Sequence, residues 1–238
     1  MKVLVIIPAY NEEKSIERVV SNLREACPQA DYLIVNDCST DSTADICEKN
    51  GFSYISLPAN LGIGGGVQSG YLFAEERGYD IAIQMDGDGQ HDPRYLKDLI
   101  APIERGEADM VIGSRFITNE GFQTSGMRRL GINILKGTIR LFAHVRATDA
   151  TSGFRACSRE LICFFARNYA QDYPEPEAIV AATLNGYRIK EVPVIMVERK
   201  EGVSSINWLR SIYYMIKVNL SIVICRITYK RKNKGDQA

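Results

Sequence analysis

The sequence lacks several features that would assign it to a specialised class of protein. No uncharged hydrophobic run approaches the roughly 20 residues of a membrane-spanning helix, because Arg210, Lys217 and Arg226 interrupt the most apolar stretch, 206–227. Charge of one sign is also missing, since 29 Lys and Arg residues balance 29 Asp and Glu residues. A balanced charge gives no general attraction to nucleic acid, so we expect no nucleic-acid partner.

Paired cysteine motifs and a targeting segment are missing as well. The six cysteines are scattered without Cys-x-x-Cys or Cys/His metal-ligand spacing, which favours a reducing, cytoplasmic location. The apolar run at 3–7 is too short for the hydrophobic part of a signal peptide, so we expect it to be a strand.

The first half of the chain alternates apolar runs with helical patterns. Buried strands are predicted over 3–7, 31–36, 53–57, 80–86 and 109–113. Between them, apolar residues recur at helical spacing, with Asn11 a candidate cap of the first helix and Ser39 or Thr40 of the second. This alternation predicts an α/β fold with a mostly parallel sheet that helices cover on both faces.

The second half of the chain is less regular. It predicts a loop over 114–125, helices over 126–144 and 174–185, a strand over 187–197 and a polar loop over 198–205. A further helix and a basic tail, Lys230 to Lys234, follow these elements.

The strongest candidate for a functional site is the segment that follows the strand at 80–86. Asp86 and Asp88 are one residue apart, so strand geometry places both carboxylates on one side, and the Gln90 amide comes two positions later. Such oxygen ligands suit Mg²⁺ or Mn²⁺. Ligands of parallel sheets bind beyond the carboxyl ends of the strands, where the loops 8–12 and 36–41 are also expected.

Four segments in this order resemble the inverting family 2 glycosyltransferases with the GT-A fold: Ile7–Glu12, Val35–Asp41, Asn60–Gly66 and Asp86–Gln90. The Asp-x-Asp-x-Gln form and the later Thr151-Ser152-Gly153-Phe154-Arg155 resemble the branch of dolichol-phosphate mannose synthases and bacterial polyprenyl-phosphate glycosyltransferases. The resemblance covers about residues 1–205. It implies a nucleotide-sugar half at about 1–113 and an acceptor half at about 114–205, followed at 206–238 by an amphipathic membrane-associating helix and basic tail.

The resemblance also implies a role for each site residue. The nucleotide sugar would contact Pro8, Ala9, Tyr10, Glu12, Asp37, Gly64, Gln68, Asp86, Gly87 and Asp88. Within this set Asp37 would accept the imide N–H of uracil or the amino edge of guanine. Asp86, Asp88 and Gln90 would hold the metal ion, while Asp86, Asp88 and Arg199 would stabilise the departing diphosphate. The acceptor phosphate would contact Arg115, Arg128, Arg155 and Ser205.

Several positions have a structural alternative or depart from the family pattern. Asp41 is more readily explained as a helix cap than as a ligand. The run Gly62–Gly66 lacks the Gly-Lys-Ser/Thr ending of a phosphate loop and is expected to let a helix start pack tightly on the sheet. Asn36 stands where many relatives have a first aspartate, and Ser205 stands where dolichol-type enzymes place a lysine.

A phosphate acceptor is expected because it needs cations but no general base. The segment 206–227 fits a lipid phosphate if it lies on a membrane, with an apolar face of Trp208, Leu209, Ile212, Tyr213, Ile216 and Leu220. The alternative for this segment is a helix that packs on the core or in a dimer. We thus expect a UDP-sugar-dependent enzyme of cell-envelope glycan assembly, peripheral at the inner face of the cell membrane.

Other functions stay open. A glycosyltransferase that acts on a saccharide hydroxyl would need a base, for which Glu175, Glu177 and Asp172 are candidates. A non-catalytic nucleotide-sugar-binding protein is a further alternative. The sequence does not identify the sugar, choose finally between uracil and guanine, or decide whether a second copy or a membrane protein is a partner.

Overall fold

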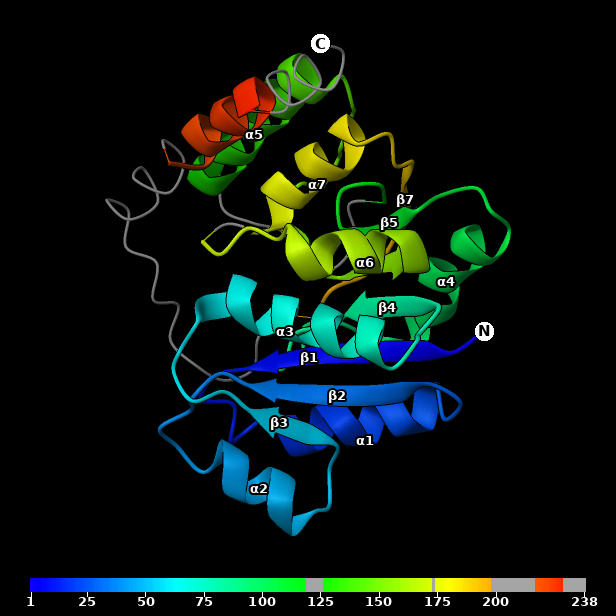
Figure 1. Ribbon diagram of the computed structural model, residues 1–238, viewed down its shortest axis with the longest axis vertical. Coiled ribbons are helices and arrows are strands. Elements are labelled where there is room, and N and C mark those ends of the chain that lie inside the picture. Colours follow the sequence, from blue (N-terminus) through cyan, green and yellow to red (C-terminus); the bar gives the residue numbers. More distant parts are fainter. Residues whose placement is uncertain (119–125, 173, 198–216, 229–238) are drawn as a thin grey trace.

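A seven-stranded mixed sheet forms the centre of the molecule, with the strand order β3-β2-β1-β4-β6-β5-β7. The computed structural model in Figure 1 describes residues 1–118, 126–172, 174–197 and 217–228, with the side chains of 126–130 left out. The strands are β1 (Val3–Ala9), β2 (Asp31–Asn36), β3 (Tyr54–Ser56), β4 (Ile81–Gln84), β5 (Met110–Ser114), β6 (Arg155–Ser158) and β7 (Ile189–Pro193). All neighbouring pairs are parallel except those of β6, which runs antiparallel to both β4 and β5.

The helices cover both faces of this sheet, as the sequence predicted. They are α1 (Ile16–Ala26), α2 (Thr43–Lys49), α3 (Gly62–Glu76), α4 (Leu96–Glu104), α5 (Gly126–Ala143), α6 (Arg159–Arg167) and α7 (Pro174–Leu184), with the 3₁₀ turn η1 (Pro93–Tyr95) before α4. Alternate residues of each strand point to opposite faces. Leu4 and Ile6 therefore join one core with α3, α5, α6 and α7, whereas Val5 and Ile7 join another with α1 and α4.

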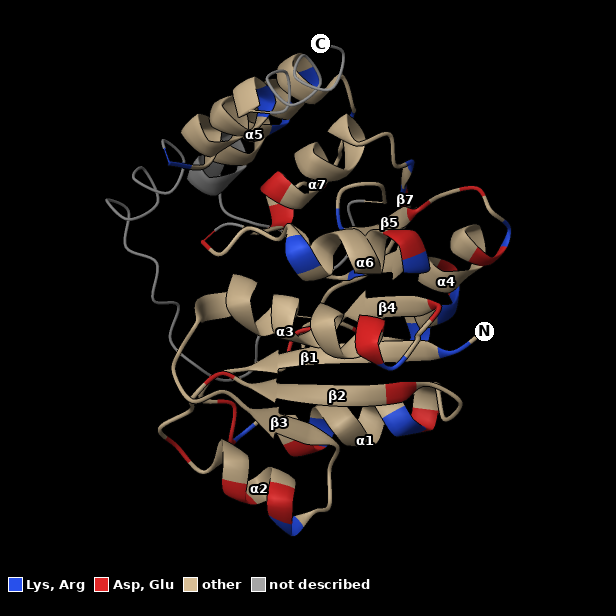
Figure 2. Ribbon diagram, in the orientation of Figure 1, with Lys and Arg blue, Asp and Glu red and all other residues tan. Residues whose placement is uncertain are grey.

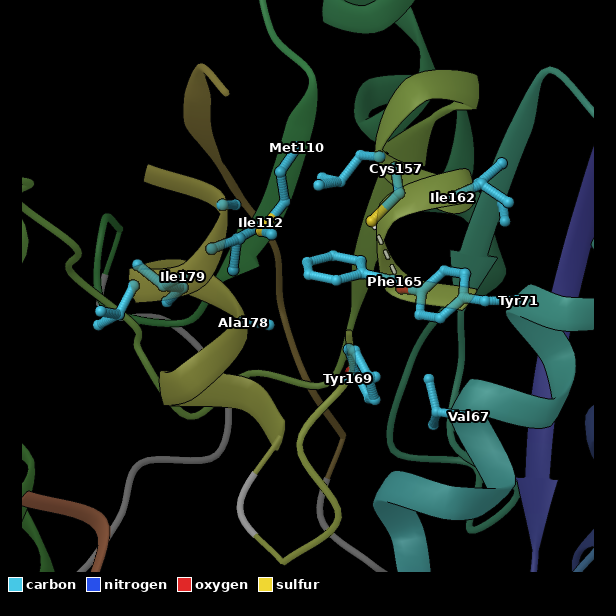
Figure 3. Close-up of a cluster of buried hydrophobic side chains, with 14 of the residues drawn as sticks. Val67, Tyr71, Met110, Ile112, Cys157, Ile162, Phe165, Tyr169, Ala178 and Ile179 are labelled. Carbon is cyan, nitrogen blue, oxygen red and sulfur yellow. Dashed lines mark hydrogen bonds between the residues drawn. The ribbon is translucent and has the colours of Figure 1, made fainter. Parts of the chain in front are cut away.

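Aromatic residues fill the first of these cores. Tyr71 on α3, Phe165 on α6 and Tyr169 lie with ring centroids 5.1–5.5 Å apart. The Tyr71 hydroxyl contacts the Cys157 thiol on β6 at 3.4 Å (Figure 3). Burial raises the pKa of this thiol to about 11, so it stays a neutral packing group near pH 7.

Glycines let α3 approach its neighbours closely. A Cβ atom at Gly70 would lie 2.3 Å from the Ile6 side chain on β1, and one at Gly64 would lie 2.2 Å from the carbonyl oxygen of Ala170. The glycine-rich start of α3 therefore packs against the loop after α6 as well as on the sheet. The sequence predicted only the contact with the sheet.

The last described element is a helix over 217–228, which lies beside α5 (Figure 1). Val218 and Ile222 are fully buried in the core that α5 and α7 share, and Thr138 of α5 donates a hydrogen bond to Asn219. On the outer face, Leu220, Ile224 and Ile227 are each more than half exposed. The rest of the predicted apolar face, Trp208 to Ile216, lies outside the described residues.

Within the described parts of the chain, no helix combines the length and the apolar character needed to cross a membrane.

Candidate active site

A pocket of about 350 Å³ opens where β1, β2 and β4 end. Its lining consists of Pro8, Ala9, Tyr10, Glu12, Asp37, Asn60, Gly62, Ile63, Gly66, Asp86, Gly87 and Asp88. Most of the predicted nucleotide-sugar residues are thus brought together, although the chain separates them by up to 80 positions. Another pocket, of about 400 Å³, lies beside Arg24 and Tyr32 near the start of β2 and contains none of the predicted site residues.

Two loops at the rim of the pocket are locked to each other. Asn11 after β1 and Cys38 after β2 both adopt a φ of 57°, in the left-handed region. The Asn11 side chain accepts a hydrogen bond from the Thr40 amide at 2.8 Å, and the Ser39 hydroxyl accepts one from the Asn11 amide at 3.0 Å. The predicted caps were therefore wrong, because these side chains join the loops while α1 and α2 begin after Ser15 and Ser42.

Asp41 has a structural position in the same pair of loops. Its carboxylate accepts hydrogen bonds from the amide and hydroxyl of Thr43 and from the amide of Glu13. Burial would raise the pKa of Asp41, but these donors outweigh it and hold the pKa below its usual value. This geometry agrees with the capping interpretation.

Asp37 combines a place in the pocket with a structural contact. Its side chain is almost completely buried, and one carboxylate oxygen accepts a hydrogen bond from the Leu61 amide at 2.7 Å. Asn60 also donates to the Asp37 carbonyl oxygen. The neighbouring Asn36 bonds with Ser56 and with the Ser39 amide, so an amide side chain at this position can hold β3 and the loop together.

Asp86 and Asp88 line the pocket on the same side, as period-2 geometry predicted. The Asp86 amide donates to Nδ1 of His91 at 3.0 Å, and the Asp88 carboxylate accepts from the Gln90 amide at 2.9 Å. Gly87 between them lies so close to β1 that a Cβ atom would be 3.0 Å from the Pro8 carbonyl oxygen. The loop is therefore fixed by the backbone on both sides of the carboxylates.

The donor set at this loop fits a hard divalent cation. Two carboxylates facing one pocket suit Mg²⁺ or Mn²⁺, which keep several waters and share their coordination with phosphates. Among the described residues, no three His, Cys, Asp or Glu side chains gather into a complete protein site. This arrangement agrees with a metal ion that binds together with a diphosphate.

Gln90, Gln68 and Gly64 lie differently from the predicted ligands. The Gln90 side chain donates to the Val197 carbonyl oxygen at 3.4 Å, so it connects the Asp86 loop to the segment after β7. Gln68 donates to the Ala166 carbonyl oxygen and accepts from Gln171, facing α6. Neither glutamine nor Gly64 lines the pocket.

On the acceptor side, Arg115 is held at the end of β5. Its guanidinium makes two 2.7 Å hydrogen bonds to the fully buried Asp149 carboxylate and another to the Thr151 hydroxyl at 2.9 Å. The amides of Thr148 and Asp149 in turn donate to Glu191 of β7. This network, whose acidic members were not predicted, fixes the direction of the Arg115 side chain.

Arg155 takes a position that differs from that of an acceptor ligand. The residue is completely buried, and its guanidinium donates to the carbonyl oxygens of Ser152 and Glu175. It connects β6 to the start of α7, and we therefore leave it out of the proposed acceptor site. The Arg128 side chain, Arg199 and Ser205 lie outside the described parts of the structure.

The three candidate bases for a hydroxyl acceptor lie near the C-terminal helix or Arg155. Asp172 forms an ion pair with Lys217, and Glu177 accepts a hydrogen bond from Ser221. Burial raises the pKa of Glu175, partly opposed by the nearby positive charge of Arg155. Asp172 and Glu177 thus contact the C-terminal helix.

The fold and this pocket together define a sugar-nucleotide-dependent transferase, and comparisons with known proteins specify its family. Residues 4–165 match the model of Glycosyl transferase family 2, and the chain belongs to that family. The predicted family, fold class and enzyme class are thereby confirmed.

Several characterised proteins are similar over most of the chain. A polyprenol monophosphomannose synthase of Mycolicibacterium smegmatis is 30% identical, covering 87% of this chain and 81% of the relative. An undecaprenyl-phosphate mannosyltransferase of Micrococcus luteus is 32% identical, covering 87% and 88%. A UDP-N-acetylglucosamine–dolichyl-phosphate N-acetylglucosaminyltransferase of Methanococcus voltae is 32% identical, covering 81% and 84%.

A solved structure shares the fold. The crystal structure of glucosyl-3-phosphoglycerate synthase from Mycobacterium tuberculosis, determined with Mn²⁺, UDP-glucose and phosphoglyceric acid, superposes with a TM-score of 0.71. It covers 94% of this chain and 79% of the other at 21% identity.

Proposed function

We propose that this chain is a metal-dependent inverting glycosyltransferase that moves a sugar from a nucleotide-diphosphate sugar to polyprenyl phosphate in glycan assembly. The observation that carries the proposal is the pocket in which Asp37, Asp86 and Asp88 meet at the ends of adjacent strands. Relatives named for polyprenol or undecaprenyl phosphate align with 87% of the chain, which supports the same class of acceptor.

The donor would bind along this pocket with its base near Asp37. The Asp37 carboxylate can accept a hydrogen bond from the uracil imide, and the half-exposed Tyr10 ring offers a flat surface nearby. Glu12 can accept from ribose hydroxyls. A uridine nucleotide is favoured because the Methanococcus voltae relative is named for a UDP-sugar, and guanine is the fallback.

Asp86 and Asp88 would hold Mg²⁺ or Mn²⁺ together with the diphosphate. When bound, such an ion supplies positive charge that stabilises the departing nucleoside diphosphate. The tightly held loop keeps both carboxylates directed to the pocket, so little reorganisation is needed as that charge develops. Arg199 would add a further positive charge from the loop after β7.

The acceptor would be a phosphate because it is already nucleophilic near neutral pH. A phosphate monoester has a second pKa of about 6, so its oxygen needs no general base. Arg115 at the end of β5 is oriented by Asp149 and is the described residue that we assign to this side. Arg128 and Ser205 are the further proposed acceptor ligands.

A membrane surface would present this acceptor to α5 and the helix over 217–228. These helices contain six Lys and Arg residues and no Asp or Glu, and Figure 2 shows them without acidic positions. Apolar side chains are exposed on both: Ile134 and Leu141 on α5, and Leu220, Ile224 and Ile227 on the C-terminal helix. Basic helices with exposed apolar side chains suit the interface of an anionic leaflet.

A screen of nucleotide sugars with undecaprenyl phosphate, read by mass spectrometry, tests the proposal. We expect one UDP-sugar or GDP-sugar to give a sugar–lipid monophosphate, with activity lost in EDTA and restored by Mg²⁺ or Mn²⁺. Transfer to a free saccharide without any glycolipid product would contradict the lipid acceptor. Binding of nucleotide sugars without any turnover would instead favour the non-catalytic alternative.

Glu175→Gln separates the two enzyme classes, because the raised pKa of Glu175 makes it the best-placed candidate base. An enzyme that deprotonates a saccharide hydroxyl would lose nearly all activity in this variant. We expect transfer to polyprenyl phosphate to continue.

A further inference from the structure

Gln84 is a buried amide at the end of an otherwise apolar strand. Its side chain has no exposed surface, and Ile81, Ala82 and Ile83 before it on β4 are all core residues. A buried amide without hydrogen-bond partners is unfavourable, so its contacts explain why glutamine stands here. Gln84 Nε2 donates to the Asp86 carboxylate at 3.2 Å, and Gln84 Oε1 accepts from the Tyr169 hydroxyl at 3.5 Å.

The inner side of the Asp86 carboxylate is enclosed by further groups. A Cβ atom at Gly153 would lie 3.1 Å from both carboxylate oxygens and 2.9 Å from Gln84 Nε2. The His91 ring stacks on Phe154, with centroids 4.8 Å apart, and its Nε2 lies 3.7 Å from the carboxylate. About a third of the Asp86 side chain stays exposed, and Asp86 lines the pocket.

We propose that Gln84 is a positioning residue that holds the Asp86 carboxylate in the orientation in which it binds the metal ion. The inference rests on the metal-dependent transfer proposed above. The amide can act in one direction only, because a flipped amide would place Oε1 against a carboxylate oxygen. Tyr169 fixes this direction, since its hydroxyl donates to Oε1.

The consequence is a carboxylate that binds metal without first losing rotational freedom. Groups that hydrogen-bond to a metal ligand orient it, and their loss typically weakens metal binding or activity by about 10- to 100-fold. Leucine at position 84 would fill a similar volume but would leave Asp86 without its inner donor. The nucleoside end of the donor, near Asp37, would be unaffected.

The test measures Mn²⁺ affinity by electron paramagnetic resonance on the full chain in the presence of UDP. We expect Gln84→Leu to weaken Mn²⁺ binding about 10- to 100-fold, and Tyr169→Phe to weaken it less but in the same direction. UDP affinity in EDTA, measured by calorimetry, should stay within about twofold of the wild type. A merely structural loss would lower both affinities together.

Tyr71→Phe is the matched control, because it removes a buried hydroxyl from the same core. The Tyr71 hydroxyl contacts Cys157 and the Tyr71 ring packs on Tyr169, but no described contact of Tyr71 reaches Asp86. Its Mn²⁺ affinity should equal that of the wild type.

Unchanged Mn²⁺ affinity in folded Gln84→Leu would overturn the proposal. If Gln84→Leu does not fold, unchanged affinity in Tyr169→Phe overturns the part of Tyr169, and in the more conservative Gln84→Asn that of Gln84. A wild-type chain that binds UDP but no Mn²⁺ would overturn the metal site itself, which is a result distinct from equal binding by wild type and variant.

Discussion

Among single residues, Asp88 gives the most direct test of the site, because its carboxylate faces the pocket and holds no core element in place. We expect Asp88→Ala to lower turnover by about 100-fold or more, the scale of losing one preorganised electrostatic group. The free energy of unfolding should fall by only about 1 kcal/mol, because the loop loses one hydrogen bond, from the Gln90 amide. Initial rates and thermal unfolding measure the two effects.

Asp92→Ala is a matched control four residues further along. Asp92 caps η1 and pairs with Arg94, but it does not line the pocket. This variant should lose about 1 kcal/mol of stability and keep its turnover. Full activity of Asp88→Ala in EDTA would show that the Asp86 loop is not a metal site.

Asp109 before β5 predicts a pH-dependent part of the stability. Hydrogen bonds from Arg188 at the start of β7 hold its pKa below the usual value, against the opposing effect of burial. The carboxylate therefore stabilises the fold above about pH 4, and this contribution disappears as the pH falls through the lower, folded-state pKa. Asp109→Asn should cost about 1 kcal/mol at pH 7, a modest value because the Arg188 side chain is exposed.

The measurement is thermal unfolding of wild type and Asp109→Asn between pH 7 and pH 3. The difference between them should shrink below about pH 4, and Arg188→Gln should show a similar deficit at pH 7. A difference that stays constant down to pH 3 would contradict the assignment of the carboxylate as the stabilising form.

Single residues also show how far the sequence could predict the site. Asp37, Asp86 and Asp88 were predictable because each follows an apolar strand, and parallel strands end at one edge. The position of Arg155 was not, because its partners are backbone carbonyls of distant segments that no side-chain pattern marks. Gln84 had a readable signal, a polar residue inside an apolar strand, but its partner Tyr169 depends on the tertiary fold.

At the scale of elements, glycines distinguish helices that pack closely from helices that face outward. Gly70 on α3 has Ile6 in the position that a Cβ atom would take, whereas a Cβ atom at Gly137 on α5 meets nothing within 4 Å. Gly70→Ala should therefore destabilise the fold by about 1–3 kcal/mol through overpacking. Gly137→Ala should stabilise it by about 0.5–1 kcal/mol through helix propensity alone.

Chemical denaturation of both variants provides the comparison, since each makes the same substitution inside a helix. Equal effects of one sign would mean that α3 does not pack on β1 as closely as the structure indicates.

The elements that the sequence missed are β6 and α6. β6 has only four residues, and it lies between β4 and β5 with antiparallel direction. Nothing in a run as short as Arg-Ala-Cys-Ser specifies two neighbours that are 45 or more positions away. β1, β2 and β5 were predictable because longer apolar runs with flanking polar loops mark them.

At the scale of the whole molecule, the helix over 217–228 joins the folded core to the proposed membrane surface. Its inner residues Val218 and Ile222 are buried against α5 and α7, so Ile222→Asn should cost about 2–4 kcal/mol. Deleting 217–238 would expose the apolar residues that they cover and should cause aggregation. The folded, soluble truncation expected of a purely membrane-bound helix is therefore not predicted.

The outer face of the same helix allows a separate test of membrane binding. Replacing Leu220, Ile224 and Ile227 together with Gln should leave thermal unfolding nearly unchanged, because all three are mostly exposed. Sedimentation with anionic liposomes should fall strongly, since the buried apolar area would be lost. Raised salt should weaken binding of the wild type as well, because each Lys or Arg near an anionic leaflet contributes about 1 kcal/mol. Liposome binding that neither salt nor the triple variant changes would show that the membrane contact lies elsewhere on the molecule.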